Sequence, residues 1–88
     1  MPFRLFPDVA VTDTDDGLVL LDQRTGRYWQ LNSTGAAVLR CLLDGQSTEG
    51  AVAELTARYQ VEGDKAMNDV VTLSDELRTA RLLKGPDE

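Results

Sequence analysis

The 88-residue chain contains no histidine and one cysteine, Cys41. The absence of imidazole removes the commonest general base and a common metal ligand. Cys41 lies in a helical pattern with no histidine to activate its thiol, so we interpret it as a packing residue. A single cysteine cannot form an internal disulfide, which favours a reducing compartment. We therefore expect a protein that is not an enzyme.

Long apolar runs are also lacking. No segment approaches the roughly 20 apolar residues of a membrane helix, and the N-terminus lacks the apolar stretch of a signal peptide. Together with the single cysteine, this predicts a cytoplasmic protein without a membrane partner. Fifteen acidic and nine basic residues give a net charge of −6, which opposes nucleic-acid binding and favours a basic or apolar partner.

Motifs for metals and cofactors are incomplete. Asp13, Asp15 and Asp16 resemble part of a calcium loop but lack its remaining ligands, so a solvated turn fits them better. The glycines are scattered singly and form no phosphate-binding loop. We expect no metal, no cofactor and no catalytic residue.

What the chain does contain is a change of hydrophobic period. Short β-rich runs at residues 9–12, 18–21 and 28–31 are separated by turns that end in Gly17 and Gly26, which predicts an antiparallel meander of three strands. By the two-residue period, Trp29 and Leu31 share the core face, whereas Tyr28 and Gln30 lie on the other face.

A helical period follows, and it predicts three helices. The first has Asn32 or Ser33 as its N-cap and ends at Gly45, the second starts at Ser47, and the third extends from about Asp64 to about Leu83. The apolar stripes comprise Val38, Leu39, Leu42 and Leu43, then Val52, Leu55 and Tyr59, then Ala66, Val70, Leu73, Leu77 and Ala80.

The fold class is therefore α+β: a three-stranded antiparallel sheet followed by three helices, in a winged-helix-like arrangement. We expect one domain over residues 1–84 and a flexible tail over 85–88. The likeness to winged helices raises the alternative of a DNA-binding regulator, but the second helix offers only Arg58 as a cation, and the net charge opposes this reading.

The last strand, residues 27–31, is an edge if strand order follows chain order, and an edge can template an added peptide strand. The third helix could supply a second wall, with Asp69, Asp75 and Glu76 flanking its apolar arc. The alternative is that this helix is simply the core helix and that the N-terminal segment covers the edge.

The order of short motifs resembles the PqqD-like family. The resemblance rests on the segments 17–22 (GLVLLD), 25–35 (TGRYWQLNSTG) and 38–45 (VLRCLLDG), and continues through Ala51-Val52, Leu55, Tyr59, Val61, residues 69–77 and Leu82-Leu83. Such proteins are recognition elements of ribosomally made, post-translationally modified peptides. The resemblance implies that a precursor's leader docks as a fourth strand on the third strand, in a cleft against the third helix.

Among such proteins, the chain looks most like the free-standing leader-binding protein of lasso-peptide biosynthesis. The resemblance implies a separate cysteine-protease-type leader peptidase as partner, with the cyclase as a second candidate. The alternative is the pyrroloquinoline quinone type, a peptide chaperone for a radical SAM or other modifying enzyme.

The resemblance also implies which residues meet the peptide. The main-chain groups of Arg27, Tyr28, Trp29, Gln30 and Leu31 would pair with it, and Asp69 and Glu76 would contact its basic side chains. The candidates for the apolar wall are Met67, Val70, Val71, Leu73, Ser74 and Leu77, with Val70, Leu73 and Leu77 as first choices.

Overall fold

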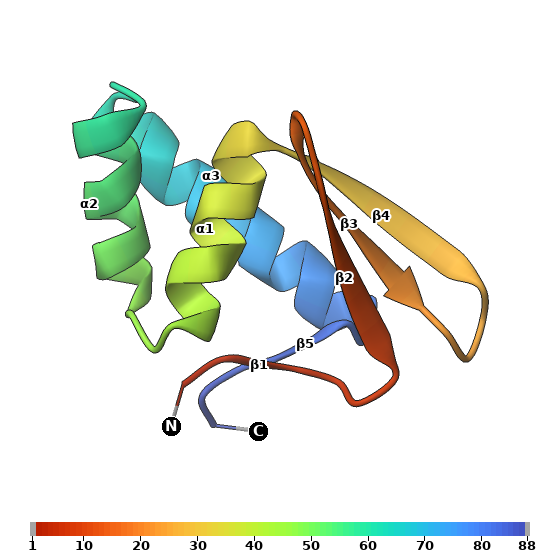
Figure 1. The fold of residues 1–88 in the computed structure, drawn as a ribbon. Helices are drawn as coiled ribbons and strands as arrows, with labels where there is room; N and C mark the ends of the chain where they lie inside the picture. Colours follow the sequence, from red (N-terminus) through yellow and green to blue (C-terminus); the bar gives the residue numbers. More distant parts are fainter. Residues whose placement is uncertain (1, 88) are drawn as a thin grey trace.

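A computed structural model describes residues 2–87. The elements in chain order are β1 (Arg4–Leu5), β2 (Val9–Thr14), β3 (Gly17–Asp22), β4 (Arg27–Asn32), α1 (Ser33–Leu43), α2 (Thr48–Arg58), α3 (Gly63–Thr79) and β5 (Leu83–Lys84). Strands β2, β3 and β4 form an antiparallel sheet in that order, and the three helices pack on one side of it (Figure 1). The predicted α+β class and the meander are confirmed.

Two local features set the geometry of the β3–β4 hairpin. The amide of Gly26, which has a positive φ of 76°, donates to the carbonyl of Asp22 at 2.8 Å. The buried Asp22 carboxylate accepts from the Arg24 backbone and side chain, and this hydrogen bonding holds the pKa of Asp22 below its usual value. At the far end, a Cβ on Gly17 would lie 1.9 Å from the Leu31 carbonyl oxygen, so only glycine permits this approach.

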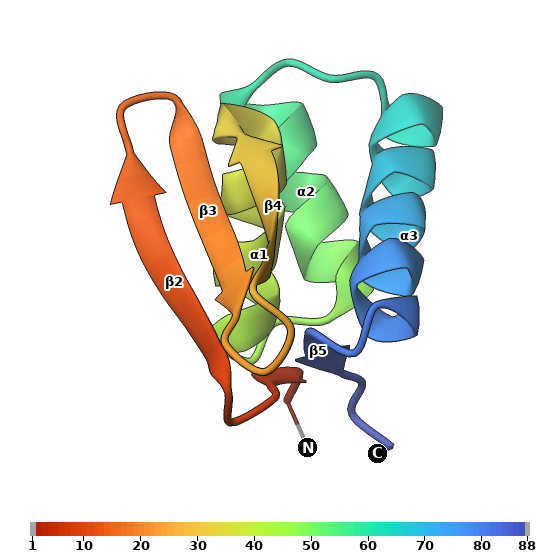
Figure 2. The ribbon, with the colours of Figure 1, turned by 90° about the vertical axis from the view of Figure 1, so that its right-hand side faces the viewer.

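Register places the two faces of the sheet as predicted. Leu18 lies opposite Leu31, and Leu20 opposite Trp29. Leu18, Leu20 and Leu31 are buried, and Trp29 is half-buried against the same core. On the outer face Tyr28 is 70% exposed, because no helix covers that side of the sheet (Figure 2).

The helices begin at side-chain caps. Asn32 accepts a hydrogen bond from the Gly35 amide at the start of α1, and Ser47 accepts one from the Gly50 amide at the start of α2. Gly45, with φ at 96°, follows the end of α1. The core contains the buried stripes of all three helices, among them Leu39, Leu42, Leu55, Val70 and Leu77.

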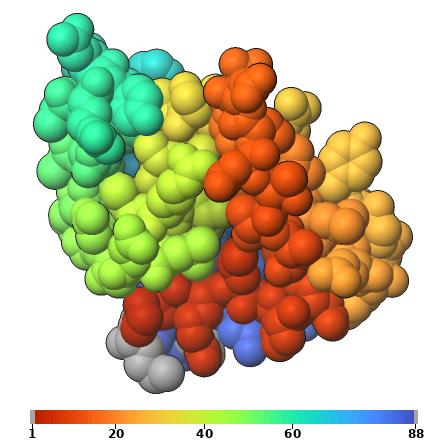
Figure 3. All heavy atoms as spheres, viewed as in Figure 1, coloured from red at the N-terminus to blue at the C-terminus, as the bar shows by residue number. Residues whose placement is uncertain are grey.

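The predicted end of the third helix was wrong. α3 ends at Thr79 with Ala80 as its C-cap, and Arg81 adopts a left-handed φ of 61° that turns the chain away from the helix axis. Leu83 and Lys84 then pair with β1. Leu82 and Leu83 are buried, so their apolar character serves the core without extending the helix. The N-terminal segment therefore joins the C-terminal one and lies beside it at the base of the molecule (Figure 3). It does not cover β4.

The predicted domain boundary lies between residues 84 and 85, directly after β5. Gly85 is buried and Pro86 half-buried, whereas Glu88 lies outside the described residues. The division into residues 1–84 and a flexible tail stays a prediction.

Candidate peptide-binding site

Strand β4 is an edge of the three-stranded sheet. The Gln23 amide donates to the Asp8 carbonyl at 3.0 Å, which continues the β2–β3 register as a hydrogen-bonded pair. Because such pairs alternate in an antiparallel ladder, Arg27, Trp29 and Leu31 face β3 with their main-chain groups. The N–H and C=O groups of Tyr28 and Gln30 then point to the free side of the sheet. The predicted pairing of a leader with the main-chain groups of Arg27, Trp29 and Leu31 is therefore corrected, because these groups are used in the ladder with β3.

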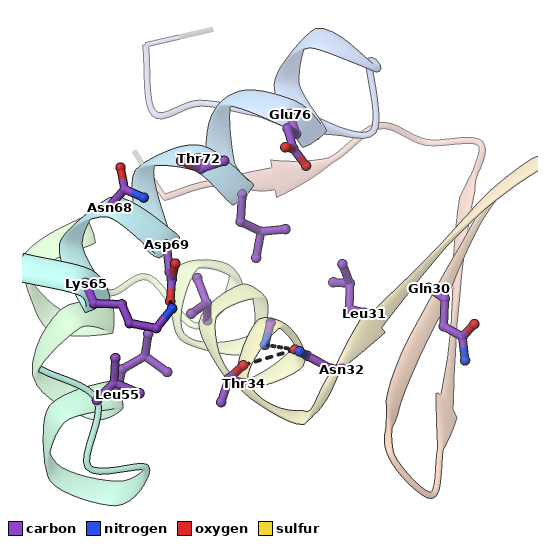
Figure 4. A pocket seen from close by; sticks show the side chains of 14 residues that line it. Gln30, Leu31, Asn32, Thr34, Leu55, Lys65, Asn68, Asp69, Thr72 and Glu76 are labelled. Carbon is purple, nitrogen blue, oxygen red and sulfur yellow. Dashed lines mark hydrogen bonds and ion pairs between the residues drawn. The ribbon is translucent and has the colours of Figure 1, made fainter.

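A groove of about 620 Å³ lies beside the second half of this strand. Its walls come from distant parts of the chain: the end of β4, the first turns of α1, the α2–α3 region and one face of α3 (Figure 4). The lining residues are Gln30, Leu31, Asn32, Thr34, Gly35, Val38, Leu55, Val61, Lys65, Asn68, Asp69, Thr72, Leu73 and Glu76.

The floor of the groove is apolar and its rim is polar. Leu31, Val38 and Leu55 are buried, and Leu73 is half-buried where it packs against the core. At the rim Lys65 and Asp69 form an ion pair with 3.3 Å between the Lys65 Nζ and an Asp69 carboxylate oxygen. This arrangement suits an extended segment that inserts apolar side chains and keeps its polar atoms near solvent.

The structure brings five of the predicted site residues into the groove: Gln30, Leu31, Asp69, Leu73 and Glu76. It places three others, Val70, Ser74 and Leu77, in the buried core. Their burial on the core side of α3 leaves the groove to the adjacent stripe of the helix. Two of the three first choices for the apolar wall, Val70 and Leu77, therefore lie in the core, and Leu73 alone of the three lines the groove.

The remaining predicted residues lie outside the groove. Met67 and Val71 are exposed on α3 without lining it, as is the flanking acid Asp75. On the first half of β4, the Arg27 guanidinium lies 5.1 Å from the centre of the Trp29 ring. Tyr28, on the outer face, is the most exposed large apolar side chain described.

Sequence reasoning missed the part of the wall contributed by α1 and by the α2–α3 connection. The contribution of α1 could have been found from Asn32 and Gly35, because the cap that they form starts a helix directly after the edge strand. Val61, by contrast, lies in an irregular segment after α2, and nothing in its local pattern assigns it to the groove.

Chemistry outside the groove is sparse in the described part of the chain. Cys41 is buried, and burial together with the nearby Glu54 charge raises the pKa of its thiol, so it stays protonated near neutral pH. Residues 2–87 contain no cluster of side chains suited to a metal ion. No helix among them has the length and apolar character to cross a membrane.

The fold and the groove define a small α+β domain with an open strand edge beside a helix-lined groove. The family model described as "Coenzyme PQQ synthesis protein D (PqqD)" matches residues 17–83. The chain belongs to the PqqD family.

Two solved structures share the fold. Lasso peptide synthetase B1 complexed with the leader peptide has a TM-score of 0.87 and 42% identity, over 96% of this chain and 99% of the other. TbiB1 in complex with the TbiA(beta) leader peptide has a TM-score of 0.82 and 28% identity, over 93% and 95%. No curated protein sequence matches the chain.

Proposed function

We propose that this protein binds the leader region of a ribosomally synthesised precursor peptide by adding the leader as a strand to β4. The observation that carries the proposal is the free edge of β4 beside a groove with an apolar floor. An edge supplies main-chain hydrogen bonds to any extended peptide, whereas a groove selects among side chains. The protein thus combines a general means of capture with a specific one.

The relatives support the identity of the peptide. Both similar structures are complexes with leader peptides, and the likeness extends over nearly the whole of each chain. A lasso-peptide precursor is therefore the favoured ligand.

The bound leader is presented to other proteins, and this domain supplies no chemistry of its own. Its only thiol is buried and protonated, and the chain has no histidine. The partners are a separate cysteine-protease-type leader peptidase and, as a second candidate, the cyclase. The lone cysteine fits a reducing, cytoplasmic setting for this step.

A second candidate is a peptide chaperone of the pyrroloquinoline quinone type, which would deliver a precursor to a radical SAM or other modifying enzyme. The description of the matching family model favours it. The two candidates share the capture step and differ in the enzyme that receives the peptide.

Fluorescence polarisation tests the proposal. The probe is the labelled leader of the precursor encoded beside this gene, and a scrambled leader is the control. We expect saturable binding near or below micromolar that scrambling abolishes. A folded protein that binds neither peptide would contradict the proposal. Competition by the radical-enzyme precursor in place of the lasso leader would support the second candidate.

A further inference from the structure

The groove beside β4 contains one acidic side chain whose charge is not neutralised. Lys65 and Asp69 pair with each other at the rim. Glu76 also lines the groove, and it forms no ion pair with a cation among residues 2–87. In Figure 4 the Glu76 side chain points from α3 toward the space between this helix and Leu31. The lining therefore has a net charge of −1.

Cations near this part of the molecule are engaged elsewhere. The Arg27 guanidinium stacks over the Trp29 ring. The Arg78 guanidinium packs on Gly85, where a Cβ would lie 3.0 Å from it. Arg78 is two residues beyond Glu76, so it points about 200° around the helix from it. The charge of Glu76 remains available to a ligand in the groove.

We propose that Glu76 is a specificity-determining residue that selects leader peptides with a lysine or arginine at one defined position. The inference rests on the proposed function, and it names a feature that the leader must have. An ammonium or guanidinium group at the rim keeps part of its hydration and gains a carboxylate partner. An acidic side chain at that position would meet Glu76 and be rejected.

Geometry assigns the position. Glu76 lies about 4.5 Å further along the helix axis than Leu73, at about 1.5 Å per residue. In an extended leader, side chains on the same face are about 6.7 Å apart. The basic residue that reaches Glu76 is therefore the next residue on the same face as the side chain that packs on Leu73. β4 and α3 run in opposite directions (Figure 2). A leader that adds antiparallel to β4, which is the more stable pairing, therefore runs in the same direction as α3. In the leader sequence, the cation then lies two residues after the apolar side chain that packs on Leu73.

The test is a charge swap measured by fluorescence polarisation at low salt. The proteins are wild type, Glu76→Gln, Glu76→Lys and Asp75→Lys. Asp75→Lys is the matched control, because it changes the net charge equally on an exposed residue of α3 outside the groove. The probes are the labelled leader of the precursor encoded beside the gene and two versions with the assigned basic residue replaced by Gln or Glu. Circular dichroism establishes that each variant is folded.

We expect Glu76→Lys to weaken binding of the native leader about fivefold and Asp75→Lys less than twofold. The Glu-substituted leader should bind Glu76→Lys better than it binds wild type, and the difference should shrink as salt is raised. Equal effects of Glu76→Lys and Asp75→Lys, a leader without a basic residue at this position, or no recovery in the swapped pair would overturn the inference and leave leader binding intact. A wild-type protein that binds no leader would overturn the proposed function and this inference together.

Discussion

The two edges of the sheet, β2 and β4, flank the same central strand and are equally long, at six residues each. Their surroundings differ. β2 contributes no residue to the groove, and its Asp13, which lies opposite the buried Leu18, pairs with Arg40 of α1. An inward-facing charge on an edge strand opposes unwanted strand addition. β4 has no such charge in its second half and faces α3 across the groove, so the second wall, more than the free edge, distinguishes a binding site.

The largest effects are expected at Trp29 and Tyr28, neighbouring residues on β4 that lie on opposite faces of the sheet. We expect Trp29→Ala to destabilise the domain by about 2–3 kcal/mol, below the cost for a fully buried aromatic because the ring is half-buried. Tyr28→Ala should leave stability nearly unchanged, since the side chain is exposed. It should weaken leader binding a few-fold, because an added strand would place its own outward-facing side chains beside Tyr28. Thermal melts and leader titrations on both variants check this, and the reverse pattern would overturn the face assignment.

Proline tests the two edges directly. By the ladder alternation, the amides of Gln30 on β4 and Val11 on β2 both point away from β3. A proline at either position therefore leaves the sheet ladder intact. We expect Gln30→Pro to weaken leader binding at least tenfold, through a lost donor and a bulky ring, and Val11→Pro less than twofold. Equal effects of the two prolines on affinity, in folded variants, would remove the distinction between the edges.

β2 has no groove beside it, so removing part of the groove wall next to β4 should weaken leader binding. Leu73→Ala deletes a half-buried side chain from the groove, and we expect it to weaken leader binding about fivefold, or about 1 kcal/mol. Val71→Ala is the control on the same helix, because Val71 is exposed and does not line the groove. Isothermal titration of both variants makes the comparison. A larger loss with Val71→Ala would relocate the binding face of α3.

The smallest effect is expected at the β2 edge. Arg40→Ala removes the partner of Asp13 from an exposed ion pair, which should cost less than about 1 kcal/mol of stability. Leader affinity should stay within twofold of wild type. Denaturant unfolding measures the first quantity and polarisation the second, and a loss of affinity comparable to that of Leu73→Ala would contradict the assignment of the site to β4.

Much of the fold could be predicted because its signals are local. Alternation fixed the faces of Trp29 and Leu31, and the caps at Asn32 and Ser47 marked where α1 and α2 begin. The end of α3 could not be predicted in this way, because Leu82 and Leu83 continue the apolar period while Arg81 leaves the helical conformation. What stabilises that turn is the pairing of β5 with β1, from the other end of the chain.

The candidate site was predicted as a strand edge beside α3, but not in its side chains. An apolar helix with two adjacent stripes does not reveal from sequence which stripe meets the core. Val70 and Leu77 meet it, so Asp69, Leu73 and Glu76 face the groove. The contributions of Val38 and Val61 depend on how α1 and α2 pack beside the sheet, which no local pattern encodes.

The most direct test of leader addition to β4 is amide hydrogen exchange of the 15N-labelled protein, measured by NMR with and without the leader peptide. We expect the amides of Tyr28 and Gln30 to become strongly protected in the complex, whereas that of Val11 on the opposite edge exchanges at the same rate as before. Protection of Val11, or unchanged exchange at Tyr28 and Gln30 in a saturated complex, would contradict it.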